Sequence, residues 1–276
     1  MTKIRPAVVS GIFYPENPSL LEKEVKFYLS QANIDVSLAP RALIVPHAGY
    51  PYSGKVAGHA YKILENKNFS EIILIGPSHS FSFFGICFSP SDYFQTPLGQ
   101  VENISLKKIL KEEKNQEIKN LLGKIAFESE EIHQPEHCLE VQIPFLQVVL
   151  KNPFKIMTIL VSNFTSDKEI ESIVFFLNKI LDRNRLLIIS TDLSHYYPYQ
   201  QAISLDQKTI SLILENDEEN LKRVGEACGL NALILLLKLA QKRKLQAQLL
   251  KYLNSGDITK DHKRVVGYAS IAFFEK

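Results

Sequence analysis

Short apolar runs alternate with amphipathic stretches along most of the chain, and this alternation predicts strands that alternate with helices. The runs expected to form strands are 41–46, 71–76, 83–89, 154–162, 185–191, 244–255 (which also fits a helix) and 265–276. The stretches expected to form helices are 17–32, 53–66, 104–123, the second part of 133–151, 167–181, and two or three more between 200 and 243. Strands that are apolar along their whole length are typical of a mostly parallel sheet with helices on both faces. The sequence therefore predicts an α/β fold with a central, mostly parallel, mixed sheet.

Three positions locate helix ends within this pattern. Asn17 is a good N-cap, and Pro18 fits the first helical position. Ser53 is expected to cap the next helix. Pro144 is expected to kink or break the helix in 133–151, because proline lacks a backbone N–H. No repeat or low-complexity linker interrupts the pattern, so we expect a single domain over residues 1–276.

The composition narrows the class of protein. Of the 276 residues, 45% are hydrophobic and 22% are charged, which is ordinary for a globular protein. The 32 Lys and Arg residues against 30 Asp and Glu leave a net charge of +2, which argues against a nucleic-acid-binding or polybasic membrane-binding protein. The N-terminus lacks the apolar core of a signal peptide, and no run reaches the roughly 18 apolar residues of a membrane span. The three cysteines include no CxxC pair, so we expect a reducing, cytoplasmic setting rather than a disulfide framework.

Three of the predicted strands end at residues that can bind metal or move protons: His47, His79, and the pair Asp192 and His195. A lone histidine at a strand end is more often a hydrogen-bonded structural residue, but three such strand ends are hard to obtain from packing alone. In parallel sheets ligands bind beyond the carboxyl ends of the strands, so these four side chains are expected to share one crevice. Imidazole and carboxylate together suit zinc, iron, copper or manganese.

Other polar residues are candidates for the same site. Cys228 precedes an apolar helix, where a cysteine has a lowered pKa and can bind metal or attack a substrate; otherwise it is a small buried hydrophobe. The loop in 133–151 offers His137 and Glu140, the second as a ligand, an orienting group or a first-turn acid of a helix. Tyr52 is expected to line the pocket near His47. No phosphate-binding glycine loop and no GxSxG elbow occurs, so nucleotide binding and serine hydrolase chemistry have no support.

Five motifs, in the same order, resemble the Memo family, whose prokaryotic members are called AmmeMemoRadiSam system protein B: "VPHAGYPYSG", "GPSHS", "EHCLEVQIPFL", "STDLSHY" and "ACG". The resemblance covers essentially the whole chain. It implies a fold similar to the class III extradiol ring-cleavage dioxygenases and the LigB-like superfamily, which hold iron(II) with two His and one Glu. It implies His47 and His79 as imidazole ligands, Cys228 in the place of the Glu, and His195 as the acid/base histidine beside Asp192. The prokaryotic name also implies a radical-SAM protein and an Ammecr-domain protein as partners.

These observations lead to three hypotheses. The first is a metal-dependent redox protein, oxygenase-like, in which His195 is the general acid or base and Asp192 orients it or contributes to the metal. Its ion is iron, copper or zinc, held by His47, His79 and Cys228, and its pocket is lined by His137, Glu140 and Tyr52. The second is a crevice that binds a small molecule or peptide without turnover, in a scaffold or accessory protein. The third is a hydrolase or transferase with Cys228 as nucleophile, activated by His79 or His195.

Overall fold

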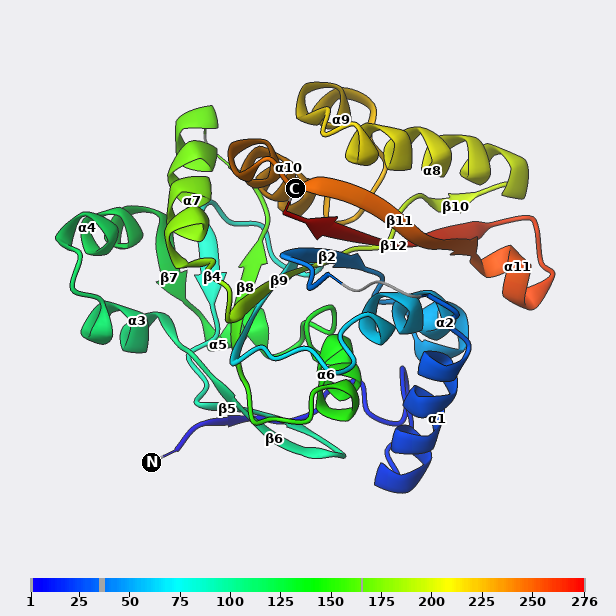
Figure 1. Ribbon diagram of the computed structural model, residues 1–276, viewed down its shortest axis with the longest axis horizontal. Helices are drawn as coiled ribbons and strands as arrows, with labels where there is room; N and C mark the ends of the chain where they lie inside the picture. The colour runs from blue at the N-terminus through cyan, green and yellow to red at the C-terminus, as the bar shows by residue number, and fades with distance from the viewer. Residues whose placement is uncertain (1, 35–37, 165, 276) are drawn as a thin grey trace.

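Helices cover both faces of a central sheet in the computed structural model, which describes residues 2–34, 38–164 and 166–275 (Figure 1). The strands are β1 (Ile4–Arg5), β2 (Ala42–Val45), β3 (Glu71–Pro77), β4 (Ile86–Phe88), β5 (Tyr93–Thr96), β6 (Gly99–Asn103), β7 (Ala126–Glu128), β8 (Lys155–Val161), β9 (Arg185–Ser190), β10 (His195–Tyr197), β11 (Gln246–Asn254) and β12 (Val265–Phe274). The helices are α1 (Pro18–Ser30), α2 (Tyr50–Lys62), α3 (Leu106–Glu112), α4 (Gln116–Ile125), α5 (Glu130–His133), α6 (Ile143–Val149), α7 (Asp167–Ile180), α8 (Tyr199–Leu214), α9 (Glu218–Val224), α10 (Leu230–Arg243) and α11 (Ser255–Thr259).

Four parallel strands form the centre of the sheet, in the order β8, β3, β9 and β2. Strand β12 joins β2 in the antiparallel sense, and the long strand β11 pairs with the other side of β12. The expected fold class, a mostly parallel but mixed sheet, is therefore confirmed. The expectation of a strand for 244–255 is also confirmed, since β11 occupies most of that segment.

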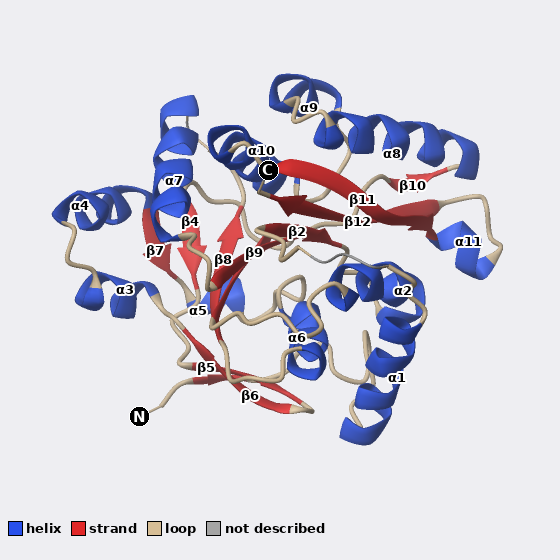
Figure 2. Ribbon diagram, viewed as in Figure 1, coloured by secondary structure: helices blue, strands red, loops and turns tan. Residues whose placement is uncertain are grey.

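Successive side chains of a central strand enter two different cores. In β3, Ile73 and Ile75 belong to a core shared with α7 and α10, whereas Ile72 and Leu74 belong to a core shared with α1, α2 and α6. Helices lie on both sides of these strands (Figure 2). Side chains of a strand point alternately to its two faces, so a strand buried on both faces is mostly apolar along its length. Each fully buried side chain of this size contributes about 1.5–3 kcal/mol to folding.

Three helix ends test the expectations from sequence. Asn17 caps α1 as predicted, its side chain accepting from the backbone N–H of Leu20 at 3.1 Å. The expectation that Ser53 caps the next helix is wrong, because α2 begins three residues earlier and the Ser53 hydroxyl donates to the carbonyl of Ala48. Pro144 does not kink a helix but lies in the first turn of α6, where the missing N–H of proline costs nothing.

Two segments differ from the predicted elements. The single helix expected over 104–123 is two helices, α3 and α4, because the side chain of Asn115 caps a new helix start by accepting from the N–H of Glu117. The hairpin of β5 and β6 was not predicted, because its short strands carry mixed rather than continuous apolar patterns.

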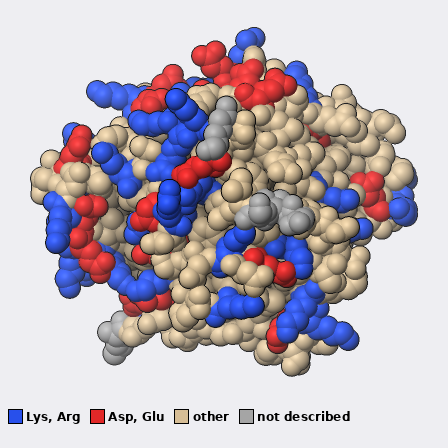
Figure 3. Space-filling model, viewed as in Figure 1, with Lys and Arg blue, Asp and Glu red and all other residues tan. Residues whose placement is uncertain are grey.

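Basic and acidic side chains are interspersed on the face of the molecule shown in Figure 3. In the described part of the chain, none of the helices combines the length and the apolar character needed to cross a membrane.

Candidate metal centre

The carboxyl ends of three neighbouring strands deliver polar side chains to one place. His47 follows β2, His79 follows β3, and Asp192 follows β9, which lies between those two strands. The rings of His47 and His79 lie 5.1 Å apart, centroid to centroid, at right angles. The Asp192 carboxylate accepts from the backbone N–H of His47 at 2.8 Å, and its other oxygen lies 3.9 Å from His47 Nε2. The predicted meeting of these three side chains is therefore what the structure shows.

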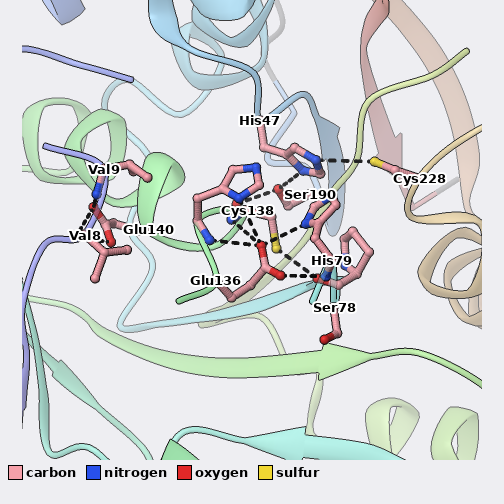
Figure 4. Close-up of polar contacts among 12 residues, drawn as sticks. Val8, Val9, His47, Ser78, His79, Glu136, Cys138, Glu140, Ser190 and Cys228 are labelled. Atoms are coloured by element: carbon pink, nitrogen blue, oxygen red, sulfur yellow. Dashed lines mark hydrogen bonds and ion pairs between the residues drawn. The ribbon is translucent and has the colours of Figure 1, made fainter. Parts of the chain in front are cut away.

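Cys228 reaches the same place from the loop before α10 (Figure 4). Its sulfur lies 3.3 Å from His47 Nε2 and accepts from the backbone N–H of Asp192 at 3.2 Å. The next residue, Gly229, packs so closely on Thr191 that a Cβ there would lie 2.7 Å from the Thr191 Cβ. Only glycine permits this approach, which brings the sulfur of Cys228 to the strand end.

The hydrogen bonds of Ser190 determine which nitrogen of His47 is free. The single hydroxyl proton of Ser190 is donated to the carbonyl of Cys138 at 2.7 Å. The oxygen must then accept from its other two neighbours, the amide of Gln142 at 2.9 Å and Nδ1 of His47 at 3.0 Å. The network therefore assigns the proton of a neutral His47 to Nδ1 and leaves the lone pair of Nε2 facing Cys228.

Glu136 determines which nitrogen of His79 is free, and its hydrogen bonds also hold the surrounding loop. Its carboxylate accepts from Nδ1 of His79 at 2.9 Å and from the backbone N–H groups of His79, His137 and Cys138 at 2.8–3.0 Å. A neutral His79 therefore carries its proton on Nδ1 and has its Nε2 lone pair free. Glu136 was not among the predicted site residues, although its place directly before His137 in the motif "EHC" was an available signal.

His137 is the third histidine of the cluster. Its ring stacks on His79 with centroids 4.7 Å apart, and it also packs on Phe13 at 4.9 Å. Ring nitrogens of His47, His79 and His137 lie within 4.8 Å of one another, and so do donor atoms of His79, Glu136 and Cys138. Imidazole nitrogens backed by a carboxylate and a hydroxyl, beside a thiol, are a donor set that suits a transition metal ion.

In the metal-free site, Cys228 and the two histidines shift one another's pKa values toward the charged forms. Burial raises the pKa of Cys228, but the charge and hydrogen bonds of His47 and His79 outweigh it and lower that pKa to about 6. Burial lowers the pKa of His47, but Cys228 and Asp192 raise it to about 9. Burial also lowers the pKa of His79, and hydrogen bonds to Cys228 and Glu136 raise it to about 10. At neutral pH these pKa values correspond to a Cys228 thiolate that faces the imidazolium rings of His47 and His79.

His137 differs from its neighbours in charge. Burial and the positive charge of His47 lower its pKa to about 4, so it is neutral at pH 7. The pKa of Glu136 lies well below its usual range, because hydrogen bonds and the charge of His79 outweigh its burial. The cluster therefore holds a neutral imidazole and permanent carboxylate charge beside the thiolate.

Glu140 does not join this cluster, contrary to expectation. Its fully buried carboxylate pairs with Arg5 at 2.7 Å and accepts from the N–H groups of Val8 and Val9 and from the hydroxyl of Tyr14 (Figure 4). Arg5 in turn donates to the carbonyls of His133, Gln134 and Glu136. Glu140 therefore anchors the N-terminal segment to the loop that carries Glu136, and its role is structural.

Two further predicted residues make no direct bond to the cluster among the described residues. Nδ1 of His195 hydrogen-bonds the carbonyl of Leu193 at 2.8 Å, so this carbonyl, and not Asp192, orients the ring. Tyr52 lies in the first turn of α2 and is 44% exposed, with no hydrogen bond of its hydroxyl among the described residues.

The fold and this group of side chains define an α/β protein with a histidine- and cysteine-lined site at the carboxyl edge of its parallel strands. Residues 5–272 match the family model described as "Memo-like protein", and the chain belongs to the Memo family. A MEMO1 family protein of Thermoplasma volcanium is 34% identical over 275 residues, which cover 97% of each chain. One of Aquifex aeolicus is 33% identical over 278 residues, covering 98% of this chain and 99% of the relative.

Solved structures resemble the chain as well. Among them, an uncharacterized protein of Escherichia coli K12 matches with a TM-score of 0.53 and 12% identity, over 85% of this chain and 99% of that one. At this identity the likeness concerns the fold alone.

Proposed function

We propose that this chain binds one transition metal ion through His47, His79 and Cys228 and acts in metal-dependent redox chemistry on a small molecule. The observation that carries the proposal is the orientation of the two imidazoles. Each ring donates its Nδ1 proton in a hydrogen bond to a neighbour, Ser190 or Glu136, so the lone pair that becomes available to an ion on loss of one proton is that of Nε2. Such fixed orientation is typical of metal-ligating histidines.

The ion would supply Lewis acidity and, if it is iron or copper, electron transfer. The thiolate of Cys228 favours softer ions such as copper or zinc over the hard ions that carboxylates select. His137 is neutral and lies within reach as a further ligand or as a partner for bound substrate. Burial of His47 and Glu136 keeps water away from the back of the site.

His195 and Asp192 are proposed to handle protons and charge. Because Nδ1 of His195 donates to the carbonyl of Leu193, its Nε2 is free to accept a proton from a substrate. The Asp192 carboxylate accepts a hydrogen bond from the backbone N–H of His47 and places negative charge beside that ring. This charge would stabilise a bound cation. In this role Asp192 serves the metal rather than His195.

The experiment is elemental analysis of anaerobically purified protein beside His47→Ala, His79→Ala and Cys228→Ala. We expect about one ion per chain in the parent, as for other three-ligand catalytic sites, and loss of that ion in each variant. His262→Ala is the matched control, because this exposed histidine stacks on Tyr199 and has no contact with the cluster. A metal content well below one ion per chain, unchanged by the three substitutions, would contradict the proposal.

A cysteine nucleophile is a second candidate, favoured by the lowered pKa of Cys228 and by His47 at 3.3 Å. In that case metal would inhibit rather than support turnover. Mass spectrometry of metal-free protein incubated with activated acyl esters tests it. An acyl group on Cys228 that forms without metal, with release of the alcohol of the ester, and is then removed by water favours the nucleophile. Absence of the acyl group favours the metal site.

A further inference from the structure

Tyr196 is held in a conformation that its own residue type disfavours. It lies in β10 at a bulge in the pairing with β12, and its φ is 65°. A bulky side chain in this left-handed region is strained, and such strain persists only where the surroundings enforce it. The ring is nevertheless 61% exposed, so little burial compensates the strain. The bulge leaves the Tyr196 ring at the surface, and bulges are over-represented next to functional sites.

The guanidinium of Arg264 lies over this ring, 4.9 Å from its centroid. Stacking fixes the plane of the guanidinium and leaves its N–H groups at the edge free for a planar or tetrahedral anion. Among the ion pairs of the described residues, none includes Arg264. Lys263, its neighbour, is exposed and likewise has no ion pair there. An oriented cation without an acidic partner is therefore available to a ligand.

This pair lies next to His195, the residue proposed to handle protons. His195 precedes Tyr196, and the two rings are 5.7 Å apart. Backbone hydrogen bonds join Leu193 and Ser194 to Gly267, and β10 pairs with the first residues of β12. The segment after Asp192 and the segment after Arg264 are thus bound together, beside α11 at one end of the sheet (Figure 1).

We propose that Arg264, stacked on Tyr196, binds an anionic group of the molecule that enters the His47, His79 and Cys228 site. The inference rests on the proposed function in that it takes this site to receive a small molecule. The recognised chemistry is a phosphoryl or carboxylate group, which a guanidinium binds through two parallel hydrogen bonds. The remainder of the ligand lies along His195 toward the histidine cluster.

The chain contains no tryptophan, so Tyr196→Trp places a single indole under Arg264 and keeps an aromatic face there. Metal-free Tyr196→Trp protein is titrated with inorganic phosphate and, separately, with succinate, at constant ionic strength. We expect a saturable change in indole emission, and binding about tenfold weaker after Arg264→Gln in the same background. The probe that binds more tightly tells whether phosphoryl or carboxylate groups are preferred. Lys23→Gln is the control, because it removes one exposed positive charge from α1.

A second readout links the anion to the site. A saturating anion should slow alkylation of Cys228 by iodoacetamide in the parent and leave the rate unchanged in Arg264→Gln. Emission changes without this protection would place the anion off the path to Cys228 and overturn the inference, as would equal affinities in the two backgrounds. Both measurements use metal-free protein, so their outcomes do not depend on whether the protein binds a metal ion.

The variant Tyr196→Gly tests whether the ring of Tyr196 serves anion binding or folding. Glycine adopts a φ of 65° without strain, so the melting temperature should stay the same or rise while anion binding weakens. A marked fall in melting temperature would show that the ring serves folding and would overturn the argument from strain.

Discussion

The sulfur of Cys228 lies 3.3 Å from Nε2 of His47, although 181 residues separate them in the chain. The two residues reach this distance because β2 and β9 are adjacent and because two hydrogen bonds join Cys228 to Asp192 at the end of β9. The backbone N–H of Cys228 donates to the carbonyl of Asp192, and the backbone N–H of Asp192 donates to the sulfur of Cys228. Each group changes the proton affinity of the other, and this coupling underlies the first two predictions.

In metal-free protein, Cys228 should react as a thiolate from mildly acidic pH upward. Its lowered pKa predicts an iodoacetamide rate that is half-maximal near pH 6 and constant above neutrality. His47→Gln removes the facing positive charge, so the midpoint should move to higher pH and the rate at pH 6.5 should fall. Peptide mapping of alkylated protein at several pH values measures both.

Cys87 and Cys138 provide internal controls for that experiment. Both thiols are buried, and burial raises their pKa values, that of Cys87 to about 12. They should remain unlabelled in folded protein. A Cys228 profile with its midpoint near that of an ordinary thiol would contradict the thiolate and imidazolium arrangement.

Binding of a metal ion should release protons from both histidine ligands. With pKa values raised to about 9 and about 10, His47 and His79 are protonated at neutral pH and must lose a proton each to bind the ion. Between about pH 7 and pH 8.5 the apparent affinity for Zn²⁺ should therefore rise by about a hundredfold per pH unit. Competition with a chelator of known pH dependence measures this slope, and a slope near zero would mean that the rings are already neutral.

Two glutamates four residues apart should give opposite results. Glu136→Gln removes the negative charge that orients His79 and should weaken metal binding by about 10–100-fold. Glu140→Gln leaves the buried Arg5 without its partner and should lower the free energy of unfolding by about 3–5 kcal/mol, with a much smaller effect on metal affinity. Urea denaturation and chelator competition on both variants give the comparison, and the reverse pattern would refute the assigned roles.

His133 should make stability depend on pH in the acid range. It is buried and donates from Nε2 to the carbonyl of Cys87, and burial lowers its pKa to about 4. Since the unfolded chain takes up this proton near pH 6.5 and the native state does not, stability is full above pH 6.5. It is then lost at up to about 1.4 kcal/mol per pH unit as the pH falls toward 4. His133→Gln keeps a donor for Cys87 and should flatten this part of the profile. If the pH dependence of stability between pH 6.5 and pH 4 is unchanged in that variant, groups other than His133 cause it.

Several elements could be predicted because their signals are local. The central strands are continuous apolar runs, and Asn17 followed by Pro18 marks a helix start through contacts within one turn. The expectation for Ser53 failed because Pro51 already fits the first turn of α2, so the helix begins at Tyr50. The β5 and β6 hairpin was missed because its strands are stabilised by β1 and β8, which are distant in sequence.

The sequence by itself determined the parallel sheet and the strand ends at His47, His79 and Asp192, because burial on both faces requires apolar runs and ligands gather beyond the carboxyl ends. The tertiary structure alone decided which polar neighbours complete the site. Glu136 orients His79 whereas Glu140 pairs with Arg5, although the two carboxylates are only four residues apart and of the same residue type. The difference arises from which distant side chains each carboxylate meets on folding, and residue type and spacing carry no information about that.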